Sequence, residues 1–294
     1  MLEMGPLAFR AVCTARRLLR RVARVFRPAE ALARLVRVAL RRVDVRAPLK
    51  PPAAAAGPPR TMVGAADDDR LMRRLAKYGV HESALTRLTL KTLRPGDVAV
   101  DVGAHIGYFT LLAARAVGPR GRVVAVEPEP RNFRALLRNL RRARVGNVLA
   151  VRAAASDRRG ETWLRLSEEH PGDHRIAAVA EGVRIRVEAT TLDALLGRAR
   201  AAFVKIDVQG AEPLVLAGMR KTLAACPDVL VACEYWRPGY ARLGFDADRF
   251  LALLDELRLF PRLLRRDGDE VPLDPAALAG DSILTLLLRR SRSG

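Results

Sequence analysis

Hydrophobic positions in this chain follow two different periods. Between residues 97 and 290, short apolar runs alternate with segments in which apolar residues recur every three or four positions. The short runs predict buried strands and the longer segments predict amphipathic helices. Such an alternation is typical of an α/β domain with a mainly parallel sheet and helices on both faces. The expected strands are 98–102, 122–126, 147–153, 203–208, 230–233 and 283–288, and the expected helices are 106–117, 131–142, 213–225 and 248–259. Two extra strands, 161–166 and 183–188, are expected from their period-two alternation.

The first 46 residues have another pattern, because arginines interrupt every apolar stretch. Leu18, Leu19, Val22, Val25 and Phe26 stand at helical spacing, and arginines occupy most positions around them. This pattern predicts a basic amphipathic arm, which can lie on an anionic membrane surface, dock on the domain, or form a solvated tail. The same arginines speak against a secretory signal.

A linker is expected after this arm. Five prolines flank a run of four alanines there, and such a composition offers too few packing groups to form a core. We therefore expect a basic amphipathic arm over 1–46, a Pro/Ala-rich linker over 47–66 and a globular α/β domain over 67–294.

Composition narrows the possible classes of protein. Half of the residues are hydrophobic and three are cysteines, which excludes a disordered chain and a disulfide scaffold. The formal charge of +20 is typical of a nucleic-acid binder. However, 47 of the 52 basic residues are arginines, which indicates codon bias, and residues 1–60 alone carry +11. The charge therefore does not favour nucleic acid as the partner.

The strongest chemical signal is the sequence DVGAHIG at 101–107, between an expected strand and its helix. Doubly wound sheets bind ligands beyond the carboxyl ends of their strands, where glycine lets the backbone approach a nucleoside. Glu127 ends the next strand, 24 residues after Gly103, where a carboxylate can accept hydrogen bonds from both ribose hydroxyls. Together these features predict a nucleoside-containing cofactor.

The glycine positions discriminate between two cofactors. A dinucleotide fingerprint needs glycine at its first, third and sixth places, which are here Gly103, His105 and Tyr108. S-adenosylmethionine has no pyrophosphate, and its ammonium group suits an acidic neighbour such as Asp101. We therefore favour S-adenosylmethionine, with an NAD-dependent oxidoreductase as the alternative. Asp101 by itself can also serve only to hold a turn.

The segment KIDVQGAE at 205–212 brings charged residues to the end of another strand. Period two places Lys205 and Asp207 on one face, and such residues need partners or a role when they are buried. Asp207 is a candidate general base, substrate ligand or metal ligand, with Lys205 as its electrostatic partner. The alternative is a structural Lys205–Glu212 ion pair. Glu234, which ends the next strand, is a further candidate base, metal ligand or structural carboxylate.

His174 stands between two expected strands near the region that should cover the substrate. It is a candidate base, although a lone loop histidine is more often inert. The three cysteines lack the paired spacing of a zinc site and suit a reducing cytoplasm. On the need for a divalent metal the sequence is silent.

Five ordered segments make residues 82–290 resemble the FkbM-type methyltransferases of the class I S-adenosylmethionine-dependent superfamily. These segments are PGD at 95–97, DVGAHIGYFT at 101–110, VEP at 126–128, ASD at 155–157 and KIDVQGAE at 205–212. The resemblance implies a Rossmann-like, doubly wound, mainly parallel sheet of seven strands with helices on both faces, and S-adenosylmethionine as the cofactor.

The resemblance also implies functional residues. The residues expected to line the cofactor site are Asp101, Gly103, Gly107 and Glu127. Asp157 is expected to hydrogen-bond the adenine amino group. His105 departs from the family pattern, in which Asn is usual, but imidazole can also donate and accept hydrogen bonds.

The family's activity implies methylation of a hydroxyl group on a small metabolite, a sugar or a glycolipid precursor. We expect a cytoplasmic enzyme with possible peripheral contact to anionic membranes through its arm. The domain expected over 67–294 is then the S-adenosylmethionine-dependent methyltransferase domain. An RNA methyltransferase that uses the basic surface and a non-catalytic scaffold are further alternatives.

Overall fold

The computed structural model describes residues 3–4, 44–48, 61–65, 71–167, 174–176 and 183–290. The chain divides into two units: residues 1–81 with 168–172 form the first, and the remainder forms the second. The elements of the first unit are β1 (Glu3–Met4), β2 (Asp44–Pro48), β3 (Thr61–Ala65) and α3 (Leu71–Tyr78). β2 pairs with β1 and β3 in one sheet, and α3 contacts β2.

The predicted N-terminal arm lies outside the described residues for almost all of its length. Within the predicted linker, β3 is described, and Met62 and Val63 in it are buried. The boundaries at 46 and 66 stay predictions.

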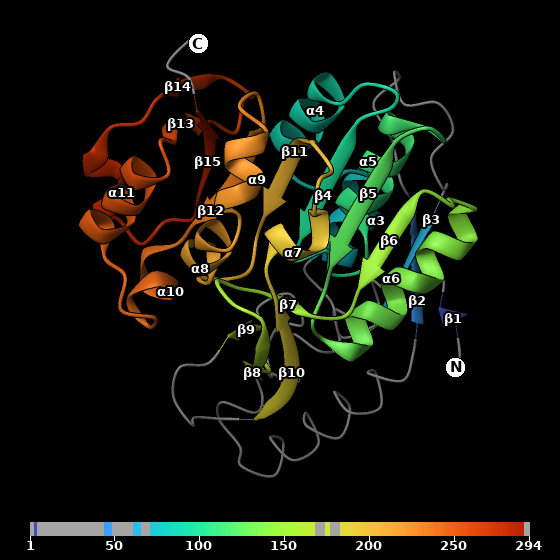
Figure 1. Cartoon of the computed structure of the whole chain (residues 1–294). Helices are drawn as coiled ribbons and strands as arrows, with labels where there is room; N and C mark the ends of the chain where they lie inside the picture. The colour runs from blue at the N-terminus through green and yellow to red at the C-terminus, as the bar shows by residue number, and fades with distance from the viewer. Residues whose placement is uncertain are drawn as a thin grey trace. The chain divides into compact units, whose positions relative to one another are not determined.

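Eight strands of the second unit form one mixed sheet (Figure 1). They are β4 (Val98–Val102), β5 (Arg122–Val126), β6 (Val148–Val151), β11 (Ala201–Ile206), β12 (Leu230–Tyr235), β13 (Phe260–Leu264), β14 (Glu270–Pro272) and β15 (Leu284–Arg289). Their order in the sheet is β14-β13-β15-β12-β11-β4-β5-β6. The strands from β12 to β6 in this order are parallel neighbours, and β13, β14 and β15 pair antiparallel. Central parallel strands are covered on both faces, which explains their continuous apolar runs.

The prediction of seven strands is wrong, because the sheet has eight. β13 and β14 form an antiparallel hairpin that was not expected from the sequence. Pro261 and Arg262 stand inside β13, and proline lacks the N–H group that a strand interior normally uses. Pairing with β15 nevertheless places this segment in the sheet.

Helices cover the large sheet from both sides (Figure 1). On one side, α4 (Ser83–Thr92) and α5 (Tyr108–Val117) contact each other, and α5 contacts β4 and β5. On the other side, Val204 and Ile206 of β11 share a core with helix residues, among them Val215 and Phe250. The helices of that core are α7 (Leu192–Leu196), α8 (Glu212–Ala217), α9 (Arg220–Ala225), α10 (Arg237–Ala241) and α11 (Ala247–Glu256), while α6 (Pro130–Ala143) follows β5.

One of the expected helices is interrupted in the structure. The predicted helix at 213–225 is divided into α8 and α9. In the described part of the chain, no helix combines the length and apolar character that crossing a bilayer requires.

A second, smaller sheet contains four strands of the same unit. They are β7 (Ala154–Ala155), β8 (Gly160–Arg165), β9 (Arg175–Ile176) and β10 (Arg184–Thr190), in the order β7-β10-β8-β9. β8 and β10 correspond to the two extra strands expected from period-two alternation. In Figure 1 this sheet projects beyond the carboxyl ends of the parallel strands.

Candidate active site

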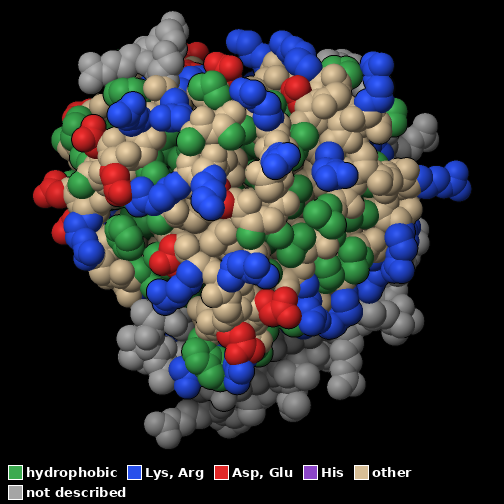
Figure 2. All heavy atoms as spheres, in the orientation of Figure 1, with side chains coloured by type: hydrophobic (Ala, Val, Ile, Leu, Met, Phe, Trp, Pro, Cys, Tyr) green, Lys and Arg blue, Asp and Glu red, His purple; other side chains and the backbone are tan. Residues whose placement is uncertain are grey.

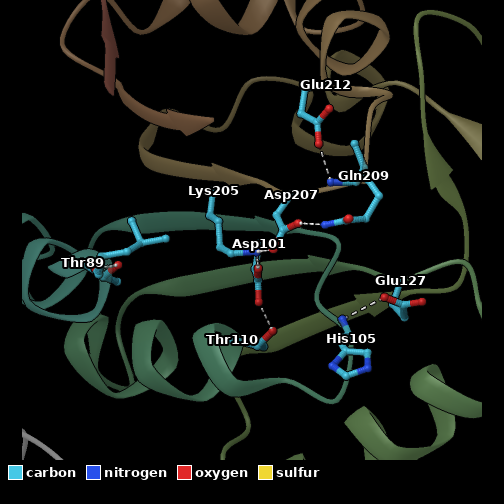
Figure 3. A network of polar contacts seen from close by, with 11 residues as sticks. Thr89, Asp101, His105, Thr110, Glu127, Lys205, Asp207, Gln209 and Glu212 are labelled. Carbon is cyan, nitrogen blue, oxygen red and sulfur yellow. Dashed lines mark hydrogen bonds and ion pairs between the residues drawn. The ribbon is translucent and has the colours of Figure 1, made fainter. Parts of the chain in front are cut away.

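The register of the parallel strands brings the predicted charged residues together. Lys205 of β11 lies opposite Asp101 of β4, and Ile206 lies opposite Cys233 of β12. Asp207 comes directly after Ile206 and Glu234 directly after Cys233, so both residues lie at the carboxyl edge of the sheet. Because side chains alternate along a strand, Asp101 and Lys205 both face the side covered by α4 and α5. Figure 3 shows Asp101, Lys205 and Asp207 converging at this edge.

Lys205 is a buried cation between two carboxylates. Its Nζ lies 3.1 Å from Oδ2 of Asp207 and 3.8 Å from Oδ1 of Asp101. The Nζ also lies 5.2 Å from the centroid of the Phe109 ring. Burial lowers the pKa of Lys205, but the charges of Asp207 and Asp101 outweigh burial and hold this pKa above its ordinary value. Lys205 is therefore charged at neutral pH.

Asp101 has one satisfied and one unsatisfied carboxylate oxygen. The hydroxyl of Thr110 in α5 donates to Oδ2 over 2.5 Å. Oδ1 is buried and has no hydrogen-bond partner among the described residues. Burial raises the pKa of Asp101, while Lys205 and Thr110 act in the opposite direction. A buried carboxylate oxygen without a donor is suited to a cationic or hydrogen-bond-donating ligand.

Gln209 connects the two carboxylates at the edge. Its Nε2 donates to Oδ1 of Asp207 over 2.8 Å and to Oε2 of Glu234 over 2.9 Å. Its backbone is left-handed, with φ of 57°. Burial, followed by the charges of Asp207 and Glu212, raises the pKa of Glu234 well above its ordinary value. The side chain of Asp207 is 27% exposed, so this carboxylate can be reached from solvent.

The role of Gln209 was not predicted, since its partners come from two strands. The only available signal was an amide side chain beside a glycine at the end of a charged strand.

Glu212 holds the turn that follows β11. Its Oε1 accepts from the backbone N–H of Val208 and its Oε2 from that of Gly210, at 2.8 and 2.9 Å. Glu212 is fully buried, and burial raises its pKa to about 8. In the described part of the chain, Lys205 pairs with Asp101 and Asp207 rather than with Glu212. In place of the alternative Lys205–Glu212 ion pair, Glu212 therefore caps the backbone of the turn.

The glycine turn after β4 lies directly against the Asp207 loop. Gly103 has φ of 76°, and a Cβ atom at this position would stand 1.9 Å from the carbonyl oxygen of Asp207. Its N–H donates to the carbonyl of Val126 over 3.0 Å. Glycine is required here both for its left-handed backbone and for this close approach.

Glu127 closes the same turn from β5. Its Oε2 accepts from the backbone N–H of His105 over 2.8 Å, and its Oε1 from that of Glu129 over 2.9 Å. Burial raises the pKa of Glu127 to about 7, although both hydrogen bonds favour its ionised form. Each carboxylate oxygen retains a lone pair for a further donor. Because His105 binds Glu127 through its backbone, this hydrogen bond does not depend on the departure from Asn.

Asp157 and His174 lie farther along the chain, at the small sheet. Asp157 follows β7 and accepts a hydrogen bond from the hydroxyl of Ser156 over 3.0 Å. Nδ1 of His174 accepts from the backbone N–H of Ser167 over 3.0 Å, in the connection between β8 and β9. The roles of both residues stay predictions. Among the described residues no group of three or more His, Cys, Asp or Glu side chains could hold a metal ion.

Comparison with known families decides what kind of domain this is. A family model for the methyltransferase FkbM domain matches residues 101–260, which is more than half of the chain. The chain belongs to the FkbM methyltransferase family. S-adenosylmethionine is therefore the cofactor of this domain, and the NAD alternative is set aside.

Individual relatives of this FkbM-family chain differ in how much of it they match. The hexuronic acid methyltransferase AglP of Haloferax volcanii is 28% identical over 193 residues, which are 64% of this chain and 74% of that protein. The protein-L-isoaspartate O-methyltransferase of Methanothrix thermoacetophila is 37% identical over 91 residues, 31% of this chain and 40% of that protein. The crystal structure of methyltransferase FkbM from Methylobacillus flagellatus has a TM-score of 0.43 at 16% identity. That alignment covers 69% of this chain, which spans only 50% of the other.

Proposed function

We propose that this FkbM-family methyltransferase methylates a hydroxyl group of a saccharide, most specifically of a sugar acid. The observation that carries the proposal is the pair of carboxylates, Asp207 and Glu234, that Gln209 holds at the carboxyl edge of the sheet. A hydroxyl nucleophile needs such a base to remove its proton. The name of the relative AglP, a hexuronic acid methyltransferase, supports a sugar acid as the acceptor.

The residues of the glycine turn fit S-adenosylmethionine. Oδ1 of Asp101, which is buried without a donor in the described part of the chain, suits the ammonium group of the cofactor. Glu127 has lone pairs for the ribose hydroxyls, and the turn around Gly103 lets the backbone approach the nucleoside. We assign His105 and Gly107 to the same turn and Asp157 to the adenine amino group, as the family resemblance implies.

Asp207 is the proposed general base, and the other residues position it. S-adenosylmethionine supplies a methyl group that is already electrophilic, so the protein's task is to orient the acceptor and take its proton. Lys205 and Gln209 hold the two oxygens of Asp207, which fixes the direction of its remaining lone pairs. Glu234 shares the amide of Gln209 and, because its pKa is raised, is the second group able to hold a proton. His174 remains a candidate for contact with the acceptor.

The acceptor class is tested with purified protein, S-adenosylmethionine and paired glycosides of a hexuronic acid and of the matching neutral hexose. We expect a product one methyl group heavier, formed faster from the uronic acid, as measured by mass spectrometry.

The general base is tested by a substitution. Asp207→Asn should lower kcat by about 10²–10⁴-fold while leaving the affinity for S-adenosylhomocysteine unchanged. Asp228→Asn, an exposed carboxylate away from the edge, is the matched control. Full turnover of Asp207→Asn with an identified acceptor would refute the base.

The cofactor assignment is tested separately by calorimetry. Glu127→Gln should weaken binding of S-adenosylhomocysteine by about 10–100-fold, because hydrogen bonds to a charged acceptor are lost. Glu256→Gln, in an exposed ion pair with Arg220, is the control that changes the same charge. Unchanged affinity in a folded Glu127→Gln protein contradicts the ribose role.

A further inference from the structure

The small sheet has one apolar face and one charged face. Leu164 of β8 lies opposite Ile185 of β10, and Leu164 is almost fully buried. Trp163 lies opposite Arg186 in the next pair, so both point to the other face. On this outer face stand Glu161, Trp163, Arg165, Arg175, Arg184, Arg186 and Glu188.

Three arginines form a straight row across this outer face. Arg184 of β10 lies opposite Arg165 of β8, and Arg165 lies opposite Arg175 of β9. Like charges directly opposite each other on neighbouring strands are destabilising. Arg165 and Arg184 have no carboxylate partner among the described residues, whereas Arg186 pairs with Glu161. We call Arg165, Arg175 and Arg184 the arginine row.

Trp163 orients the end of this row. The guanidinium of Arg184 lies over the Trp163 ring, 4.3 Å from its centroid. The indole remains 41% exposed, which is a large apolar surface to leave in water. A guanidinium stacked on an aromatic ring is held in a plane and still presents its N–H edge to a ligand.

The small sheet joins the rest of the unit near the active site, and the row lies six residues along β10 from this junction. β7 begins two residues before Ser156, whose N–H donates to the carbonyl of Thr190 at the end of β10. The β7 end of the small sheet therefore lies next to Asp157, which is expected to contact the cofactor. Figure 1 shows β8, β9 and β10 beyond the carboxyl ends of β11 and β4, and Figure 2 shows apolar, basic and acidic side chains on the surface there.

We propose that the arginine row and Trp163 bind the carboxylates of an acidic saccharide and so select the acceptor. The proposal rests on the function proposed above and adds the residues that would recognise the acceptor. Guanidinium groups bind carboxylates through two parallel hydrogen bonds, and neighbouring arginines in the row are about one strand spacing, 4.8 Å, apart. Binding of an anionic group relieves the repulsion between Arg165 and Arg184, and the exposed indole of Trp163 offers an apolar surface to the sugar ring.

A direct binding measurement tests this site without turnover. The full chain with Trp236→Phe retains Trp163 as its one tryptophan, since the sequence contains two. A short oligogalacturonate is titrated against it while the fluorescence of Trp163 is followed. We expect saturable binding that weakens at least about tenfold in the double variant Arg165→Gln/Arg184→Gln, because charged hydrogen bonds are lost. The double variant Arg134→Gln/Arg141→Gln, on the exposed face of α6, removes the same charge and should bind normally.

Several results would overturn the proposal. They are the absence of binding, equal weakening in both double variants, equal binding of the methyl-esterified oligosaccharide, and tighter binding of an oligoribonucleotide through the same arginines. Binding of S-adenosylhomocysteine, measured by calorimetry in each variant, confirms that it is folded. If oligogalacturonate binds through the row but neither it nor other saccharides are methylated, the proposed function fails while the binding site stands.

Discussion

The carboxyl edge of the large sheet and the outer face of the small sheet use charge in opposite ways. At the edge, Lys205 and Asp101 are buried, and each charge is held by a partner in a fixed position. On the outer face, Arg186 and Glu161 are 62% and 54% exposed, while Arg165 and Arg184 are half-buried and lack a carboxylate partner in the described residues. A buried charge is costly without an opposite charge beside it, whereas a charge that water reaches stays solvated without a partner and remains available to a ligand. The first arrangement suits chemistry and the second suits recognition.

The same contrast bears on the excess of arginine. On the face of the molecule seen in Figure 2, basic side chains are spread over many elements rather than gathered in one patch. The number of basic residues therefore says less about partners than the register that brings a few of them into one row.

The largest expected effect tests the buried side of the comparison. Lys205→Met leaves Asp101 and Asp207 without the cation between them, and breaking a buried ion pair from one side costs about 3–5 kcal/mol. We expect the free energy of unfolding in urea to fall by this amount. Adding Asp101→Asn to Lys205→Met should restore part of it, because one uncompensated charge is removed. If Lys205→Met by itself were as stable as the wild type, Lys205 would not be needed to stabilise this edge of the sheet.

A smaller loss is expected from the glycine turn. Gly103→Ala combines a left-handed backbone with a Cβ atom 1.9 Å from the carbonyl oxygen of Asp207. Overpacking and backbone strain together cost about 2–4 kcal/mol. Gly118→Ala is the matched control, since Gly118 has φ of 63° but nothing within 4 Å of the added Cβ. Equal losses of unfolding free energy in the two variants would show that the contact with Asp207 is unimportant.

The pH dependence of stability sharpens the comparison further, since it follows from burial. The pKa of Glu212 is raised from 4.5 to about 8, so the folded protein binds this proton more tightly than the unfolded chain. Its contribution to stability is present at low pH and is lost as the pH rises from 4.5 toward 8, by up to about 1.4 kcal/mol per pH unit. Glu212→Gln should show lower stability overall but a flatter dependence between pH 6 and 8, measured by urea unfolding. Exposed Glu256→Gln should keep the wild-type slope, and an equal slope in Glu212→Gln contradicts the assignment.

The smallest effect on stability is expected for the exposed ion pair on the outer face of the small sheet. Arg186 and Glu161 form an ion pair on the outer face, and such solvated pairs contribute about 0–1 kcal/mol. Arg186→Gln should therefore lower the free energy of unfolding by less than about 1 kcal/mol. Added salt should make this loss of unfolding free energy smaller, because it screens the ion pair. A loss as large as that of Lys205→Met would remove the distinction between the two regions.

The central strands were predictable because each is an apolar run between turn signals. β4 and β5 have the predicted bounds, 98–102 and 122–126. β13 was missed because proline and arginine stand inside it, and only its pairing with β15 makes it a strand. Local patterns fail wherever a long-range partner decides the structure.

The site was predictable to the same extent. Asp101, Lys205, Asp207 and Glu234 all end strands, so their convergence followed from the topology of a parallel sheet. The hydrogen bonds of Gln209 and Thr110 were not predictable, since their partners lie 25 and 9 residues away in sequence and depend on side-chain direction.

The sequence by itself determined the succession of strands and helices, the glycine turn and the family, because these depend on residue types at short spacings. The tertiary structure alone decided that Lys205 also pairs with Asp101, that Glu212 caps the turn, and that Arg165, Arg175 and Arg184 stand in one row. The reason is physical: strand register and burial set which charges meet, and neither is encoded at any single position along the chain.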